Sequence, residues 1–325
     1  MPNEVELRVF TACFTPEILS ADVDRYSGVA ADGENAPLVS RHIFHPDNAR
    51  AVEMAMDDLE RAGGPGQTIR AERVSFTHEG QKIQNVVATL PATEPPPGDG
   101  IVIISAHLDS TAMLDPWYRP CIDRAPGADD DASGIAAVLA ATRAFAELSS
   151  RGIPHREVRF ALFNSEEVGI VGSAEYAAAC AALGEKILGV FHMDMIGHDG
   201  TPPPDFEVHA GHVPPWPSNG GVLQACSRRL ADVIDRLRPA VSPCLPTPQI
   251  FDTQKDPGVG LSDHSRFHES GYAACVVSED FFPGGGLPGD QNPNYHRSTD
   301  VAVDAAFAAS VGRLVAAAAW SMATC

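Results

Sequence analysis

Several side chains that can bind a metal ion or move a proton stand directly after apolar runs of this sequence. His107 and Asp109 follow the apolar run 101–106. A histidine at the end of a strand can offer a ring nitrogen to a metal ion, and a carboxylate two residues later can hold that ring in one orientation. Taken alone, this pair is equally consistent with a hydrogen-bonded loop histidine.

Two further segments are acidic. Asp129, Asp130 and Asp131 are consecutive and precede small residues. Three adjacent carboxylates repel one another unless a cation lies between them, although a helix N-terminus also favours acidic residues. We favour metal binding for the triplet. Glu166 and Glu167 point in different directions, so one can bind a metal while the other remains free as a general base. The alternative is a solvated charge pair.

The remaining candidates are Asp194, Tyr295 and His296. Asp194 stands in an apolar segment, where a carboxylate is unfavourable unless it is paired or metal-bound. The hydroxyl of Tyr295 could donate a hydrogen bond to an oxyanion beside His296. His192 could equally be a core histidine. Imidazoles and carboxylates together suit zinc, and a carboxylate that bridges two ions is a common way to activate one water.

The apolar periodicity predicts strands and helices in alternation. Strands are expected at 101–106, 157–164, 187–195 and 272–278, with helices at 132–148, 173–183 and 222–237 and at the C-terminus. This pattern predicts an α/β fold with a mixed, mostly parallel central sheet flanked by helices. The candidate residues then lie at the carboxyl ends of strands, where such sheets place their ligands.

The chain is expected to form a single globular domain over 1–325. Residues 1–98 form a lead-in with helices at 16–26 and 45–62 and a β-hairpin at 68–90 that turns at 79–81. Residues 99–325 carry the site motifs. The apolar stretch 301–323 contains Asp304 and Arg313, so it is expected to be a buried helix rather than a membrane span.

The composition excludes some classes of partner. There are 23 Lys and Arg against 43 Asp and Glu, a net charge of −20, which repels phosphate backbones and anionic lipid. We therefore expect no nucleic-acid or membrane partner. The first ten residues lack the apolar run of a signal peptide, and the seven cysteines include no CxxC pair. These features favour reduced thiols and a cytoplasmic location, with secretion as the alternative if the N-terminus is truncated. The oligomeric state is not defined.

The motifs SAHLDS, PGADDDASG, NSEEVGIVGS, HMDMIG, SDHSRFHESGY and NPNYHRSTD occur in this order. Together they resemble metallopeptidase family twenty-eight, the dizinc exopeptidases of the bacterial leucyl aminopeptidase type. The resemblance covers roughly 101–325 and implies the zinc aminopeptidase, or phosphorylase-hydrolase-like, fold.

The resemblance also implies a role for each candidate. Two zinc ions would share the carboxylate of Asp130, which a cis peptide would join to Asp131. Glu166 would be the general base that activates a metal-bridging water, Asp109 would orient His107, and Tyr295 would steady the oxyanion. The implied ligands are His107, Asp130 and Asp194 for one ion and His296, Asp130 and Glu167 for the other. Asp263 and His264 belong to the SDH motif without a role that the sequence defines.

The implied activity is a zinc-dependent aminopeptidase that hydrolyses the N-terminal bond of peptides with a free N-terminus, preferring neutral or hydrophobic N-terminal residues. The alternatives are a glutaminyl cyclase-like transferase with one zinc, a carboxypeptidase or aminoacylase on the same fold, and a non-catalytic binding module. The glycine-rich segment 281–291 is a candidate substrate-selecting loop or a surface insertion. The candidate pocket walls are Trp216, Phe267, Phe281 and Phe282, although ordinary packing is the favoured interpretation for each of them.

Overall fold

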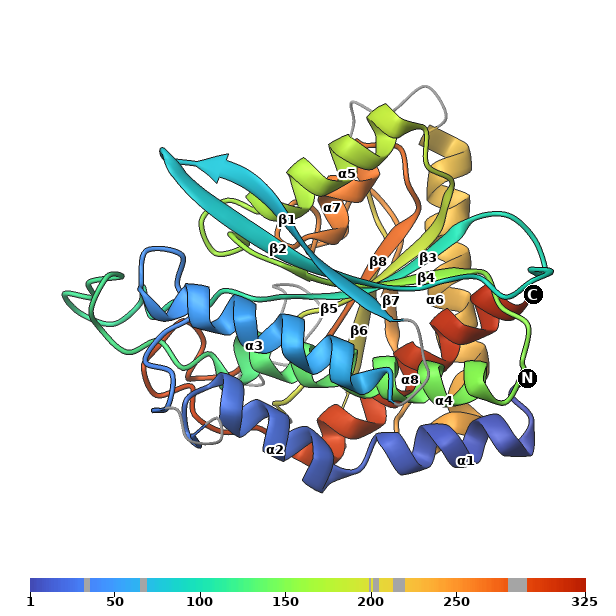
Figure 1. Ribbon diagram of the computed structural model, residues 1–325, viewed down its shortest axis with the longest axis horizontal. Helices are drawn as coiled ribbons and strands as arrows, with labels where there is room; N and C mark the ends of the chain where they lie inside the picture. Colours follow the sequence, from blue (N-terminus) through green and yellow to red (C-terminus); the bar gives the residue numbers. More distant parts are fainter. Residues whose placement is uncertain (32–35, 65–68, 199, 201–204, 213–219, 280–290) are drawn as a thin grey trace.

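The fold is a single mixed sheet with helices on both faces (Figure 1). The computed structural model describes residues 1–31, 36–64, 69–198, 200, 205–212, 220–279 and 291–325. Within these ranges the sheet has eight strands in the order β1-β2-β4-β3-β5-β8-β6-β7. The strands are β1 (Arg70–His78), β2 (Gln81–Leu90), β3 (Ile101–His107), β4 (Glu157–Phe163), β5 (Ile187–Met193), β6 (Phe206–His209), β7 (Gln249–Phe251) and β8 (Ala274–Glu279).

The middle of the sheet is parallel. β4, β3, β5 and β8 are neighbours that run in the same direction, whereas β1 and β2 on one side and β6 on the other pair antiparallel. β3 is buried along almost its whole length, as expected for a central strand covered on both faces. The predicted α/β fold with a mostly parallel mixed sheet is confirmed.

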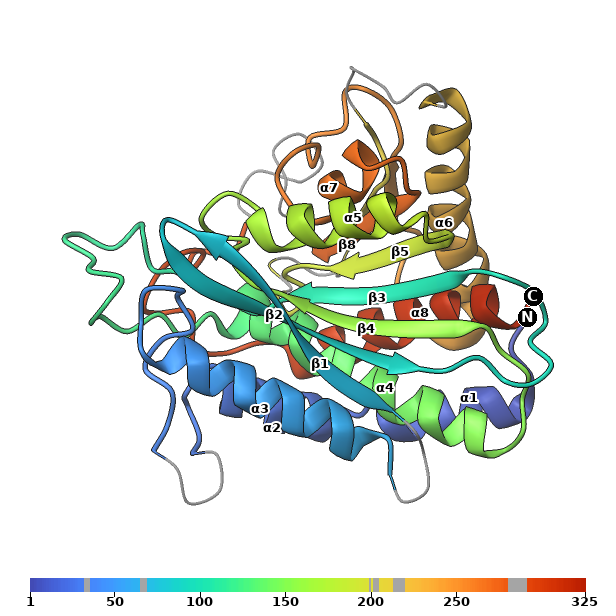
Figure 2. The ribbon, with the colours of Figure 1, turned by 45° about the horizontal axis from the view of Figure 1, so that its top comes forward.

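The helices form two layers around the sheet. α1, α2, α3, α4 and α8 cover one face, and α5 and α7 cover the other (Figures 1 and 2). α6 packs against α8. Their bounds are α1 (Glu4–Cys13), α2 (Pro16–Tyr26), α3 (Asp47–Ala62), α4 (Gly134–Ser150), α5 (Val171–Leu183), α6 (Gly220–Val241), α7 (His264–Glu269) and α8 (Ala305–Thr324), with a π-helical turn at Ala128–Ser133.

The C-terminal helix α8 is an internal helix of this fold. It is long and apolar enough for its composition alone to permit a membrane crossing, but 67% of its apolar window is buried inside the fold. The buried helix predicted at 301–323 is therefore present, beginning at Ala305. The seven cysteines, all in the described ranges, are unpaired.

Four elements were not predicted from the sequence. They are α1, the short strands β6 and β7, and the six-residue helix α7. β6 lies inside 197–221, a segment whose proline and glycine content is typical of a loop. The strand predicted at 187–195 ends earlier, at Met193, so Asp194 stands just beyond the sheet rather than within it.

Candidate active site

The candidate residues meet where the parallel strands end. His107 is the last residue of β3, Glu166 and Glu167 follow β4, and Asp194 follows β5. Figure 2 shows β3 and β5 pointing toward the same edge of the sheet. Asp130 arrives from the π-helical turn and His296 from the segment before α8. Because parallel strands place their carboxyl ends together, residues nearly two hundred positions apart share one site.

The five implied ligands form two groups that share one carboxylate. Nε2 of His107 lies 2.9 Å from Oδ1 of Asp130 and 3.6 Å from Oδ1 of Asp194. On the other side, Nε2 of His296 lies 3.2 Å from Oδ2 of Asp130 and 2.9 Å from Oε2 of Glu167. In each group the possible ligand atoms all lie within 4.8 Å of one another. The two oxygens of Asp130 therefore face different histidines.

The electrostatics of the two groups fit divalent cations. Burial lowers the pKa of His296, but the carboxylates of Glu167 and Asp130 outweigh it and raise that pKa to about 10. Burial and the nearby Asp130 carboxylate raise the pKa of Glu167 to about 7. Oε1 of Glu167 is buried and has no hydrogen-bond partner among the described residues. A buried oxygen without a donor, beside two imidazoles and further carboxylates, is a donor set that suits zinc.

The three carboxylates of the acidic triplet point in different directions. Only Asp130 faces the two histidines. The carboxylate of Asp131 accepts the main-chain N–H of His107 at 3.0 Å, and that of Asp129 accepts the N–H of Gly197 at 2.8 Å. The peptide bond from Asp130 to Asp131 is cis, as the resemblance implied. Two of the three acids thus fix the loop, and one is left for a metal.

Two positioning residues, Asp300 and Ser262, belong to motifs that carry the resemblance, although the sequence indicates no role for them. The carboxylate of Asp300 accepts the main-chain N–H groups of Asp129 and Asp130 at 3.1 to 3.2 Å. The hydroxyl of Ser262 donates to Oδ2 of Asp194 at 2.6 Å. Asp300 is the last residue of the motif NPNYHRSTD, and Ser262 is the first residue of SDHSRFHESGY. Their polar character at the ends of these motifs was the sequence signal that could have identified them.

A third positioning residue, Arg41, gave no signal in the sequence. Its guanidinium is fully buried and donates to the main-chain oxygens of Leu108, Pro126 and Gly127 at 2.8, 2.6 and 3.0 Å. A buried charge needs hydrogen-bond partners to be tolerated, and here these partners belong to the segments beside His107 and before the acidic triplet. Arg41 therefore holds together the two loops that flank the shared carboxylate.

Asp109 contacts His107 through its main chain rather than through the carboxylate that the residue spacing suggested. Nδ1 of His107 lies 3.1 Å from the main-chain oxygen of Asp109 and 3.8 Å from its carboxylate. The carboxylate instead accepts the main-chain N–H groups of Glu166 and Glu167 at 2.9 and 3.2 Å. Asp109 thus orients the imidazole with its backbone and the paired glutamates with its side chain.

We expect Asp109→Asn to weaken zinc binding by about 10- to 100-fold, the usual effect of removing a group that orients a ligand. Asparagine keeps one acceptor oxygen, but its NH2 group cannot accept a hydrogen bond, so the N–H of either Glu166 or Glu167 loses its partner. Competition with a chelator of known affinity measures the change. The matched control is Asp57→Asn on the exposed surface of α3; equal effects in the two variants would contradict this role.

Glu166 and Tyr295 face the same small pocket as the ligands. The pocket, of about 30 Å³, is lined by Asp130, Glu166, Asp194, Met195, Leu261, Tyr295 and His296. Burial, with Asp194 and Glu167 nearby, raises the pKa of Glu166 well above its ordinary value. Burial among carboxylates also raises the pKa of Tyr295, so its hydroxyl keeps its proton. A proton acceptor and a donor thus border one cavity.

Of the four candidate pocket walls, only Phe267 is among the residues that the structure describes. Phe267 is fully buried and packs against Phe163 and Tyr176, which agrees with ordinary packing rather than with a pocket wall. Trp216, Phe281 and Phe282 lie outside the described residues, as does the segment 281–291 apart from Gln291. The apolar side chains that do line the pocket are Met195 and Leu261.

The SDH motif connects the site to the interior. Oδ1 of Asp263 accepts a short hydrogen bond from the hydroxyl of Ser173, and Oδ2 lies 3.5 Å from Nε2 of His192. Nδ1 of His192 lies 3.0 Å from the Ser105 hydroxyl, and burial lowers the pKa of His192 to about 3. His192 is therefore a neutral core histidine. His264 is also buried, with its ring 5.6 Å from that of His268.

Because of this buried histidine pair, we expect stability to fall under mildly acidic conditions. Burial and the neighbouring His212 lower the pKa of His268 to about 4. The unfolded chain takes up a proton below about 6.5 and the folded chain does not, so stability is lost as the pH falls from about 6.5 toward 4. His268→Gln should reduce the loss between pH 7 and pH 5 by roughly 2 kcal/mol.

Urea unfolding in the presence of a chelator measures this difference without a contribution from metal. His78→Gln, at the end of β1, is the control. An unchanged pH dependence in His268→Gln would show that other groups cause the acid sensitivity.

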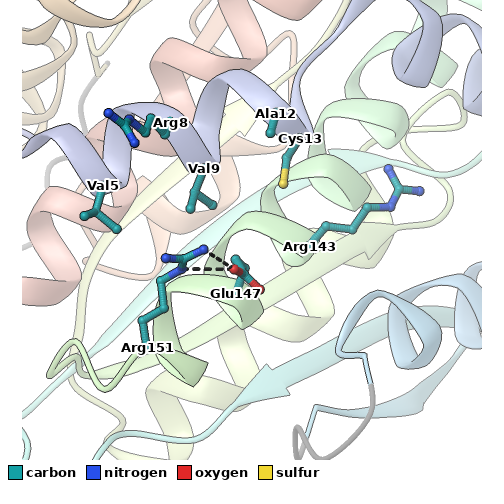
Figure 3. Close-up of a pocket in the computed structure, with 8 residues that line it drawn as sticks. All are labelled: Val5, Arg8, Val9, Ala12, Cys13, Arg143, Glu147 and Arg151. Atoms are coloured by element: carbon teal, nitrogen blue, oxygen red, sulfur yellow. Dashed lines mark hydrogen bonds and ion pairs between the residues drawn. The ribbon is translucent and has the colours of Figure 1, made fainter.

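A larger groove lies away from these strand ends, between α1 and α4 (Figure 3). It measures about 560 Å³ and has Val5, Val9 and Ala12 along one side. Its arginines are paired with carboxylates: Arg8 with Glu4, Arg143 with Asp22 and Arg151 with Glu147. Neither of the two possible metal-binding groups found among the described residues lies there, so volume alone does not identify the reactive site.

Comparisons with known proteins agree with this geometry. The chain is 29% identical over 212 residues to a probable leucine aminopeptidase 1 of Trichophyton verrucosum, covering 64% of this chain and 50% of that protein. It thus spans about half the length of the curated relatives that it matches.

Among solved structures, LapA of Legionella pneumophila superposes with a TM-score of 0.75 at 18% identity, covering 100% of this chain and 77% of the other. A glutaminyl cyclase of Porphyromonas gingivalis superposes with a TM-score of 0.64 at 14% identity, covering 95% and 99%. At these identities the likeness establishes the fold. Residues 85–319, which include every candidate ligand, match peptidase family M28, and the chain therefore belongs to that family.

Proposed function

We propose that the protein is a metallo-aminopeptidase that uses two zinc ions. The observation that carries this proposal is the pair of ligand groups that share the carboxylate of Asp130. His107 and Asp194 would complete one set and His296 and Glu167 the other. When bound, the ions would polarise the scissile carbonyl and make a water molecule more acidic.

The residues of the chain itself would carry the proton transfers. The carboxylate of Glu166, which lines the same pocket as the ligands, would accept a proton from the attacking water and deliver it to the leaving amine. The hydroxyl of Tyr295, which lines the same pocket, would donate a hydrogen bond to the developing oxyanion. Asp109 would hold Glu166 and Glu167 in place through their main-chain N–H groups.

We further propose a preference for neutral or hydrophobic N-terminal residues on peptides with a free amine. Met195 and Leu261 give the pocket apolar walls beside its acidic ligands, and apolar walls favour apolar side chains. The curated relatives include proteins described as leucine aminopeptidases. The acidic surroundings would favour a substrate end that carries an ammonium group.

The deciding experiment is product analysis by mass spectrometry. A panel of free and N-acetylated peptides is incubated with protein reconstituted with zero, one or two equivalents of zinc. Release of a single N-terminal residue from the free peptides alone, with full activity at the second equivalent, supports the proposal. Loss of ammonia from glutaminyl peptides without cleavage would instead make the protein a glutaminyl cyclase. Equal cleavage of acetylated peptides would favour an aminoacylase or a carboxypeptidase.

A further inference from the structure

A concentrated group of exposed apolar side chains lies on the segment between β3 and the π-helical turn. Met113, Leu114, Trp117 and Ile122 are 58%, 49%, 93% and 60% exposed. We refer to residues 113–122 as the apolar loop; Figures 1 and 2 show the segment around it standing out from the body of the molecule. Apolar side chains gathered on a protrusion are typical of a binding surface.

The apolar loop is held in one conformation by its own contacts. The Arg119 guanidinium pairs with the Asp123 carboxylate at 2.6 and 3.1 Å, and the ring of Tyr118 packs edge-on against that of His42. Trp117 has a φ of 64°, a left-handed conformation that is uncommon for a bulky residue and occurs often at functional sites. The indole is therefore presented to solvent by an ordered backbone.

The base of the apolar loop is attached to the segment that supplies a ligand. The main-chain N–H of Leu114 donates to the main-chain oxygen of His296 at 3.0 Å. Arg297 donates back to the oxygen of Leu114 at 3.0 Å, and the N–H of Ser298 donates to Asp115 at 2.9 Å. Trp117 is three residues from Leu114, which places its Cα at most about 11 Å away. The loop thus rises from the rim of the proposed active site.

The charges of the apolar loop are locally balanced. Arg119 pairs with Asp123 and Asp115 lies 3.7 Å from Arg297, although the whole chain carries a net charge of −20. A second copy of this chain would bring the same large negative charge to the contact. A peptide held by its N-terminal amine brings no such repulsion, and its later residues must leave the site past the rim.

We propose that the apolar loop binds the part of a peptide substrate that lies beyond the scissile bond and selects apolar side chains there. This inference rests on the proposed aminopeptidase function. An extended peptide advances about 3.3 Å per residue, so three to four residues cover the upper limit of about 11 Å, and residues from about the fourth onward are long enough to reach Trp117. The substrate class is therefore peptides of at least six or so residues with apolar side chains near positions four to six.

The test compares two octapeptides that both begin Leu-Gly-Gly and carry either leucine or serine at positions four to six. kcat/KM is measured for the zinc-loaded wild type, Trp117→Ser and the control Leu183→Ser, whose side chain is 78% exposed at the end of α5. Burying an apolar side chain favours the leucine peptide by about tenfold. That ratio should fall to near one in Trp117→Ser and persist in Leu183→Ser.

A binding measurement separates this proposal from the proposed function. Fluorescence anisotropy with labelled peptides and Glu166→Gln reports affinity without turnover, so the preference of the apolar loop is measured even if no peptide is cleaved. The same leucine-to-serine ratio with and without Trp117→Ser, in the kinetic assay and in the binding assay on the Glu166→Gln background, would overturn the proposal. It would also be overturned if sedimentation showed a dimer that Trp117→Ser dissociates while the peptide preference stays unchanged.

Discussion

Glu166→Gln is expected to retain two zinc ions and to lose hydrolysis by about 10²- to 10⁴-fold, the usual contribution of a general base. Glutamine preserves the shape of the side chain but cannot accept the proton from the attacking water. Neither ligand group includes Glu166, so metal binding should persist. Metal analysis by inductively coupled plasma mass spectrometry, together with kcat on a leucyl peptide, measures both effects.

The neighbouring Glu167→Gln is the matched control because it makes the same chemical change one residue away. Oε2 of Glu167 lies 2.9 Å from Nε2 of His296, so this variant should lose zinc as well as activity. If Glu166→Gln lost metal and Glu167→Gln retained it, the roles of the two residues would have to be exchanged. Full activity in Glu166→Gln would eliminate it as the base.

Asp130→Asn is expected to reduce zinc affinity by more than the 10- to 100-fold typical of losing a group that only orients a ligand. Asp130 belongs to both groups, so its replacement removes a charged ligand from each at once. Calorimetric titration with zinc should show both binding steps weakened. Activity should fall below detection at micromolar zinc, since neither ion is then held.

The control for Asp130→Asn is Asp232→Asn, which changes a half-exposed ion pair on α6 and should leave zinc binding intact. Weakening of only one binding step in Asp130→Asn would show that the carboxylate serves a single ion. That result would contradict a bridging role while leaving the other ligands in place.

The sequence was most informative where one local pattern determined the structure. The run 101–106 before His107 forms β3 in the centre of the sheet, because four successive β-branched residues, at 101–104, suit a strand that is covered on both faces. The turn of the first hairpin has Glu79 and Gly80 at positive φ values, as a tight two-residue hairpin turn requires. These features depend on neighbours in the chain.

Elements that depend on distant partners were not predictable. β6 is four residues long and buries Glu207 and His209, a composition that predicts a loop. The imidazole of His209 lies 2.6 Å from the carboxylate of Asp256, and no local pattern connects these positions. The helix α1, in contrast, could have been predicted, because Asn3 and Glu6 form a capping box that is readable in the sequence.

The same distinction applies to the candidate site. The ligands were grouped by a family resemblance, whereas the residues that hold them in place come from scattered positions. Arg41 donates to the main-chain oxygens of the loops beside the ligands, and main-chain oxygens leave no trace in the residue types. A sequence pattern can indicate which side chains bind a metal, but not which ones fix the backbone that presents them.

The order of the ligands along the chain has a consequence for biosynthesis. The group of His107, Asp130 and Asp194 is complete in the nascent chain long before His296 is added. At about 5–20 residues per second, the ribosome needs roughly 5 to 20 s to pass from residue 194 to residue 296. Glu167 has no His296 beside it throughout that interval, and Asp194 has no Ser262 beside it until the ribosome has passed residue 262. In the proposed dizinc enzyme, the second ligand group would be completed only after His296 has been made, so both ions could be held together only late in synthesis.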